Sequence, residues 1–112
     1  RWTGAISGGC LEGDALRQAR KAMQAGKPML VTYDTREEGN SQLKVALGCN
    51  GIIDVLIEPI DPNRPDHPVA LLQQLLENPS KMAVIATVYR VAERQQADPT
   101  SLQPGDRLLV DY

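Results

Sequence analysis

Apolar residues recur at helical spacing in two segments of the chain. In residues 11–25, they are Leu11, Ala15, Leu16, Ala19, Ala22 and Met23. Gly26 then stands where helices often end in a left-handed residue. In residues 69–76, the apolar stripe consists of Leu71, Leu72, Leu75 and Leu76, and Asn78-Pro79 follows it. The pattern predicts helices over these two segments.

Short apolar runs with β-branched residues predict the strands. The runs cover residues 29–33, 52–57, 82–91 and 107–111, and residues 2–7 are expected to end a further strand. Residues 42–47 are ambiguous between a helical turn and a strand. Polar and proline-rich segments between these elements predict turns and loops.

Helices that alternate with buried strands predict an α/β fold. We expect a single small layered domain in which helices flank a central mixed sheet, because 112 residues are too few for two independent cores. Residues 1–60 form its first region and residues 61–68 a proline-rich loop. Residues 69–112 supply a helix and strands that complete the same domain.

Composition narrows the classes of function. A net charge of -2 gives no electrostatic reason to expect nucleic acid or an anionic membrane as a partner. The sequence contains neither an apolar run of about 18 residues nor a signal peptide pattern. We therefore expect a cytoplasmic protein. Two cysteines, Cys10 and Cys49, are too few for a disulfide-stapled scaffold.

The first candidate for chemistry is a glycine-rich turn between a predicted strand and a predicted helix. Its residues are Ser7, Gly8, Gly9 and Cys10, followed by Leu11, Glu12, Gly13 and Asp14. Amides at a helix start favour an anion such as phosphate, and the same field lowers the pKa of a thiol. A tight turn with a small buried thiol explains the pattern equally well. The spacing matches neither a Walker loop nor the dinucleotide fingerprint.

The second candidate is another glycine-bracketed turn that carries a thiol. It consists of Gly48, Cys49, Asn50 and Gly51, just before the predicted strand 52–57. Asn-Gly is a strong turn signal, so the alternative is a hairpin turn with an incidental cysteine. If the two turns converge, they present two thiols to one ligand.

The remaining polar residues suggest little chemistry. Two cysteines and one histidine are too few for a closed zinc site. His67 lies in the proline-rich loop and is expected to be solvated. Glu12 and Asp14 complement the helix dipole, which competes with an anion site. Lys27 and Arg36 are candidates to contact an anionic ligand, although ordinary surface charge explains them as well.

Three blocks of the sequence resemble the XdhC/CoxI family of xanthine dehydrogenase accessory factors. They are the block GAISGGCLEGD at residues 4–14, the block PMLVTYD at residues 28–34, and the block LGCNGIIDVLIEP at residues 47–59. The blocks fall in the order and spacing of the family. The pairing of the two glycine-cysteine motifs is more specific than either motif alone.

The resemblance implies a cytoplasmic chaperone for molybdenum hydroxylases and not a catalyst. Such a protein binds molybdenum cofactor (molybdopterin) transiently, assists its sulfuration and inserts it into a xanthine dehydrogenase-type enzyme. The implied partners are that molybdenum hydroxylase and a cysteine desulfurase. The implied cofactor-binding residues are Ser7, Gly8, Gly9, Cys10, Glu12, Gly48, Cys49, Asn50 and Gly51. Soft thiols suit a molybdenum centre, so Cys10 and Cys49 are candidates to face the metal.

Two other classes of function stay open. One is a thiol-dependent oxidoreductase or sulfur-transfer enzyme, although neither cysteine has a neighbouring histidine or a CxxC partner in the sequence. The other is a cofactor-free docking domain for a molybdenum hydroxylase. Family members usually carry an additional N-terminal segment and a C-terminal Rossmann-like domain, so the chain resembles a piece of a longer protein. Exposed sheet edges in such a piece predict a homo-oligomer.

Overall fold

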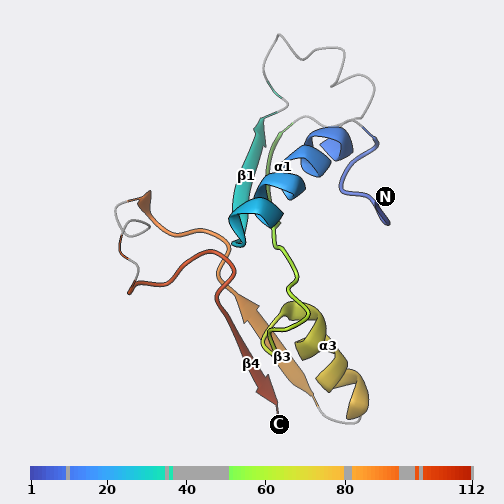
Figure 1. The fold of residues 1–112 in the computed structure, drawn as a ribbon, viewed down its shortest axis with the longest axis vertical. Coiled ribbons are helices and arrows are strands. Elements are labelled where there is room, and N and C mark those ends of the chain that lie inside the picture. Colours follow the sequence, from blue (N-terminus) through green and yellow to red (C-terminus); the bar gives the residue numbers. More distant parts are fainter. Residues whose placement is uncertain are drawn as a thin grey trace. The chain divides into compact units, whose positions relative to one another are not determined.

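The computed structural model describes residues 1–9, 11–34, 36, 51–79, 82–93, 98 and 100–111 (Figure 1). The described elements are two helices and four strands, which confirms the α/β class. The chain divides into two compact units, Arg1–Glu58 (unit 1) and Pro59–Tyr112 (unit 2). The finer division into residues 1–60, 61–68 and 69–112 stays a prediction.

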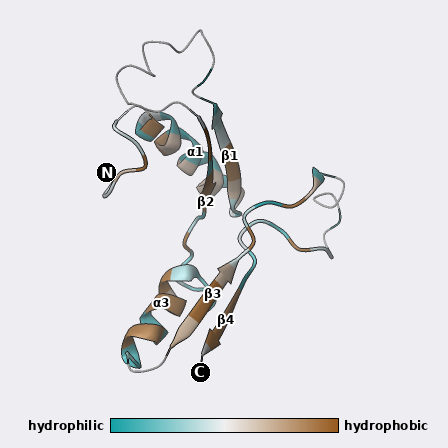
Figure 2. Cartoon of the chain, turned by 180° about the vertical axis from the view of Figure 1, so that it is seen from behind, coloured by the Kyte–Doolittle hydropathy of each residue, from teal (hydrophilic) through white to brown (hydrophobic). Residues whose placement is uncertain are grey.

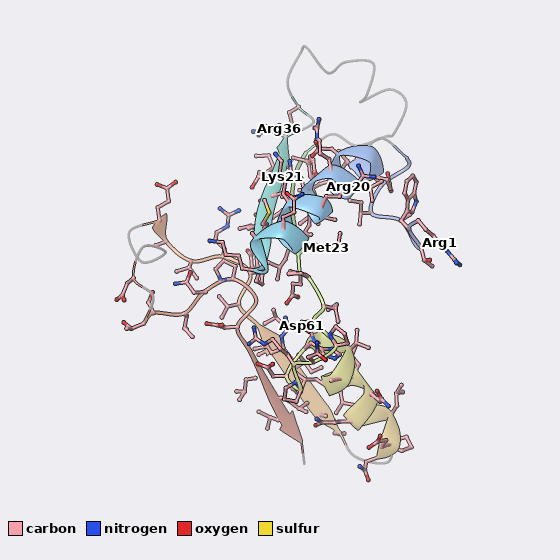
Figure 3. The ribbon with its side chains drawn as sticks, in the orientation of Figure 1. Arg1, Arg20, Lys21, Met23, Arg36 and Asp61 are labelled. Carbon is pink, nitrogen blue, oxygen red and sulfur yellow. The ribbon has the colours of Figure 1, made fainter. Side chains whose placement is uncertain are left out.

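In unit 1, helix α1 spans Leu11–Ala25, as the apolar spacing predicts. The helix ends because Gly26 adopts a φ of 67°, which a residue with a side chain rarely adopts. The Gly26 amide donates to the carbonyl of Ala22 at 2.8 Å, which completes a left-handed cap. Leu11 and Ala22 are buried, whereas Met23 is 65% exposed. Arg20, Lys21 and Met23 project from the exposed side of the helix (Figure 3).

Helix α1 contacts both strands of an antiparallel hairpin formed by β1, Met29–Asp34, and β2, Ile52–Ile57. The register pairs Tyr33 with Ile53 and Thr32 with Asp54. Alternate residues of a strand point to opposite faces, so Tyr33 and Thr32 lie on different sides of the sheet. Tyr33 points to the α1 side, because its hydroxyl bonds Asp14 of the helix.

The expected strand over residues 2–7 is wrong, since this segment forms bends and no ladder. The amides of Ile6 and Ser7 donate to the side chain of Glu12, so they cannot pair with a neighbouring strand. A side chain that bonds local backbone groups competes in this way with regular structure.

In unit 2, helix α3 spans Pro68–Glu77 and lies beside an antiparallel hairpin (Figures 1 and 2). The hairpin consists of β3, Ala83–Thr87, and β4, Arg107–Asp111. Strand β3 is shorter than the predicted run 82–91. Val88 still pairs outside the regular ladder, through its amide to Asp106 at 2.8 Å and its carbonyl to the Gly105 amide at 2.7 Å.

The described strands form two separate two-stranded antiparallel sheets, where the sequence led us to expect one central mixed sheet. The expectation depended on the alternation of helices with buried strands. Instead β3 pairs with β4, the next strand along the chain. Loop closure does not explain this choice, because β2 and β3 are also consecutive strands and closure entropy changes only slowly with loop length. Helix–strand alternation does not decide between these partners.

The buried apolar core of the described residues is small. It consists of Leu11 and Ala22, while several large apolar side chains of both units are exposed. Figure 2 shows apolar residues along most of α3, β3 and β4. A two-stranded hairpin alone is marginally stable in water, so each hairpin depends on its neighbouring helix. Neither described helix combines the length and the apolar character that crossing a bilayer requires.

Candidate functional site

The glycine-rich turn before α1 is closed by the side chain of Glu12. One carboxylate oxygen, Oε1, accepts the amide of Ile6 at 3.0 Å and the amide of Ser7 at 2.9 Å. The other oxygen, Oε2, accepts the Ser7 hydroxyl at 2.6 Å. We call this set of three bonds among Ile6, Ser7 and Glu12 the Ser7–Glu12 clasp. It ties the turn to the first turn of the helix.

The Ser7 hydroxyl also organises the residues that follow it. Its Oγ accepts the amides of Gly9 and Leu11, each at 3.2 Å. Gly9 has a φ of 122°, and a Cβ built on it would meet nothing within 4 Å. The turn therefore needs glycine at this position for its backbone conformation and not for space. Ser7 thus satisfies amides at the helix start that lack an intrahelical partner.

The clasp extends the pH range in which Glu12 is ionised to lower pH. The hydrogen bond from the Ser7 hydroxyl and the backbone amides of Ile6 and Ser7 lower the pKa of Glu12 to about 2, against an opposing effect of burial. The donors of this turn therefore already hold an anion, and that anion belongs to the chain itself. Glu12 near the helix start also complements the helix dipole, as its position predicts.

A second polar contact attaches the start of α1 to the sheet. The Tyr33 hydroxyl donates to Oδ2 of Asp14 at 2.7 Å, and Arg17 pairs with the other carboxylate oxygen. The Tyr33 bond, followed by Arg17, lowers the pKa of Asp14. Burial and then the Asp14 carboxylate raise the pKa of Tyr33 to about 12. This contact is not predictable from the sequence, because helical spacing and strand alternation do not reveal which residues meet across elements.

The contact between Asp14 and Tyr33 also locates the helix start relative to the hairpin. Tyr33 lies next to Asp34, the last residue of β1, which pairs with Ile52. Gly51 directly precedes Ile52. The first turn of α1 therefore lies at the same end of unit 1 as the start of β2, which Gly51 precedes. The helix and the hairpin are seen side by side in Figure 1.

Of the site residues that the sequence predicts, Ser7, Gly8, Gly9, Glu12 and Gly51 lie in the described part of the chain. The structure brings Ser7, Gly9 and Glu12 into one network. Cys10, Gly48, Cys49 and Asn50 lie outside the described residues. The predicted shared pocket for the two thiols stays a prediction.

Three other residues that the sequence singles out, Arg36, His67 and Lys27, lie in the described part of the chain, and the first two have bonding partners there. Arg36 pairs with Asp34 at 3.1 Å, a short-range contact that raises the pKa of Arg36. His67 is half-buried and caps α3, where its Nδ1 accepts the amide of Ala70 at 3.1 Å. The expectation that His67 is solvated in a loop is therefore wrong, and Pro68 at the first helical position was the missed signal. Lys27 is exposed.

Metal ligands do not cluster in the part of the chain that the structure describes. Within it, histidine, cysteine and carboxylate side chains form no group of three that could hold an ion.

Comparison with known proteins places a family resemblance on this same segment. Residues 1–34 match the model of the XdhC and CoxI family. The sequence blocks at residues 4–14 and 28–34 lie within the match, whereas the block at residues 47–59 lies beyond it. No curated protein and no solved structure matches the chain. The matched segment contains the turn, α1 and β1.

Proposed function

We propose that this chain is a cytoplasmic accessory factor, and not a catalyst, in the maturation of xanthine dehydrogenase-type enzymes. In this proposal it binds molybdenum cofactor, assists sulfuration of the cofactor and inserts it into the enzyme. Its partners are the molybdenum hydroxylase and a cysteine desulfurase. The single observation that carries the proposal is the match of residues 1–34 to the XdhC and CoxI family.

The geometry of the matched segment supports the proposal. Both ends of the Ser7–Glu12 clasp lie within residues 1–34, and so do both ends of the contact between Asp14 and Tyr33. The matched sequence is therefore a physically connected piece of unit 1, and its turn has a defined shape. Binding residues often lie on loops that a rigid scaffold holds in position.

The clasp restricts how the turn can meet the cofactor. Free amides at a helix start suit a phosphate, but the amides of Ile6 and Ser7 already donate to Glu12. A phosphate would also be repelled by the ionised Glu12 carboxylate. These two amides therefore do not fit the phosphate of the cofactor. Glu12 is better suited to hold the turn in shape beside the ligand.

The proposed contacts to the molybdenum centre are the thiols of Cys10 and Cys49, because soft sulfur suits such a metal. Support comes from their described neighbours in the sequence. Leu11 begins α1, whose first turn lies at the same end of unit 1 as Gly51. Leu11, next to Cys10 in the sequence, and Gly51, two positions after Cys49, thus lie at the same end of the unit.

A second candidate function is a docking domain that binds a molybdenum hydroxylase without carrying cofactor. This docking function is favoured by the bonds that Glu12 makes in the turn. The backbone amides of Ile6 and Ser7, which would otherwise be free to hold a phosphate, already donate to Glu12. This alternative shares the enzyme partner and differs only in the ligand.

A transfer experiment separates the two functions. The purified chain is incubated anaerobically with molybdenum cofactor released from a molybdenum hydroxylase, separated by gel filtration and added to the apo form of that enzyme. We expect cofactor to elute with the chain and activity to appear in the enzyme. Binding of the chain to the apo-enzyme with no cofactor retained would contradict cofactor carriage and support docking.

A further inference from the structure

Helix α1 is held in unit 1 by contacts of two kinds. Leu11 near its start and Ala22 near its end are buried, with 6% and 1% of their surfaces exposed. Apolar burial is not directional, so burial alone tolerates a small shift of the helix along the hairpin. The second kind of contact is directional. The Tyr33 hydroxyl donates to the Asp14 carboxylate at 2.7 Å, and such a bond weakens steeply when its geometry changes.

The bond between Asp14 and Tyr33 sets where the first turn of α1 lies relative to the start of β2. Asp14 belongs to that first turn, and Tyr33 precedes Asp34, which pairs with Ile52. Both partners are half-buried, and Arg17 pairs with the second carboxylate oxygen of Asp14. The carboxylate is therefore oriented from two sides. Loss of the bond is expected to let the separation between the helix start and the start of β2 vary.

We propose that Asp14 and Tyr33 are positioning residues for molybdenum cofactor, acting through these two segments and not by contact with the cofactor. The inference rests on the proposed function, in which the contacts to the metal come from Cys10, directly before α1 in the sequence, and Cys49, three positions before β2. A ligand that meets two segments binds more tightly when their separation is set in advance, because less order must be imposed on binding.

The tyrosine hydroxyl can be removed with little other change. Phenylalanine keeps the ring and its packing, so Tyr33→Phe should retain the circular dichroism of the parent chain. We expect it to weaken cofactor binding about fivefold or more, the lower end of typical couplings between separate sites. Asp14→Ala should have a similar effect, and the double variant should bind no worse than either single variant, because the two residues act as a pair. Asp14→Asn keeps an oxygen that can accept the hydroxyl, so it should restore most of the affinity.

Titration of each purified variant with released molybdenum cofactor under anaerobic conditions measures this affinity. The control is His67→Ala, which removes a hydrogen bond in unit 2 and should leave the affinity unchanged although it lowers stability. Unchanged affinity of Tyr33→Phe, or an equal loss in Tyr33→Phe and His67→Ala, would overturn the positioning role while the proposed function stands. No binding by the parent chain would refute the proposed function, and this inference with it.

A distance measurement tests the positioning in the absence of cofactor. In a background with Cys10→Ser and Cys49→Ser, spin labels are attached to Arg20→Cys on α1 and Ile52→Cys at the start of β2, both at exposed positions. Double electron–electron resonance should give a narrow distribution of label separations, which Tyr33→Phe should broaden or shift. Superimposable distributions with and without the Tyr33 hydroxyl would contradict the proposal.

Discussion

The Glu12 carboxylate accepts both the backbone amide and the hydroxyl of Ser7, at 2.9 Å and 2.6 Å. The two residues are five positions apart, with a glycine-rich turn between them. Because Glu12 is the second residue of α1, these bonds fix the turn to the helix. The chain thus supplies its own anion to the donors of a turn that, from its sequence, is a candidate phosphate site.

Removal of the Ser7 hydroxyl should loosen this turn. Ser7→Ala deletes the donor to Glu12 and the acceptor of the Gly9 and Leu11 amides. We expect a loss of about 1–2 kcal/mol in the free energy of unfolding, measured by urea denaturation. Thr3→Ala, at an exposed position of the same segment, should change it little. Equal stability of the two variants would contradict the structural role of Ser7.

Glu12 should make stability sensitive to acid. Its pKa is lowered from 4.5 to about 2 in the folded chain, first by the Ser7 hydroxyl. A lowered pKa means that the stabilisation is present above the unfolded value and is lost as pH falls through the folded value. Glu12→Gln cannot titrate, so its free energy of unfolding should fall less steeply than that of the parent chain between pH 4.5 and about 2. Superimposable pH profiles for the two chains would refute this assignment.

Tyr33 should show the opposite sign at alkaline pH. Burial and then Asp14 raise its pKa to about 12, so its stabilisation is present below the unfolded value of 10.0 and is lost as pH rises through the folded value. Tyr33→Phe should remove the tyrosinate absorbance step near pH 12. It should also cost up to about 1 kcal/mol of stability at neutral pH, through loss of the bond to Asp14. A step near pH 12 that persists in the variant would rule out Tyr33 as its source.

His67 should matter for α3 as its cap. His67→Ala removes the acceptor of the Ala70 amide and should cost about 0.5–2 kcal/mol in the free energy of unfolding. His67→Asn retains a side-chain acceptor and should restore most of this loss. If alanine and asparagine have the same effect in thermal denaturation, the capping bond is not what stabilises the helix.

The sequence predicted the elements of this chain better than their pairing. Helix α1 begins and ends where apolar spacing and Gly26 indicate, and β2 matches its apolar run. These signals are local, since each depends on a few neighbouring residues. Whether β3 pairs with β2 or with β4 depends on contacts between distant segments, and the sequence pattern contains no comparable signal for them.

Only part of the candidate site was predictable, because the sequence reveals local patterns and not the contacts between residues. The glycine-rich pattern identified Ser7 and Glu12, but not the bond between them, because their spacing differs from that of a capping box. The contact between Asp14 and Tyr33 joins residues that are 19 positions apart. Such contacts follow from the packing of α1 on the hairpin and become visible only in three dimensions.

The measurement that tests the account most directly is an anaerobic titration of the purified chain with released molybdenum cofactor, followed by the visible absorption of the cofactor. We predict a saturable change that is lost when Cys10 and Cys49 are both serine and is kept in the control Gln24→Ala, at an exposed position of α1. No change with the parent chain, or an undiminished change in the double serine variant, would contradict a cofactor site that uses these two thiols.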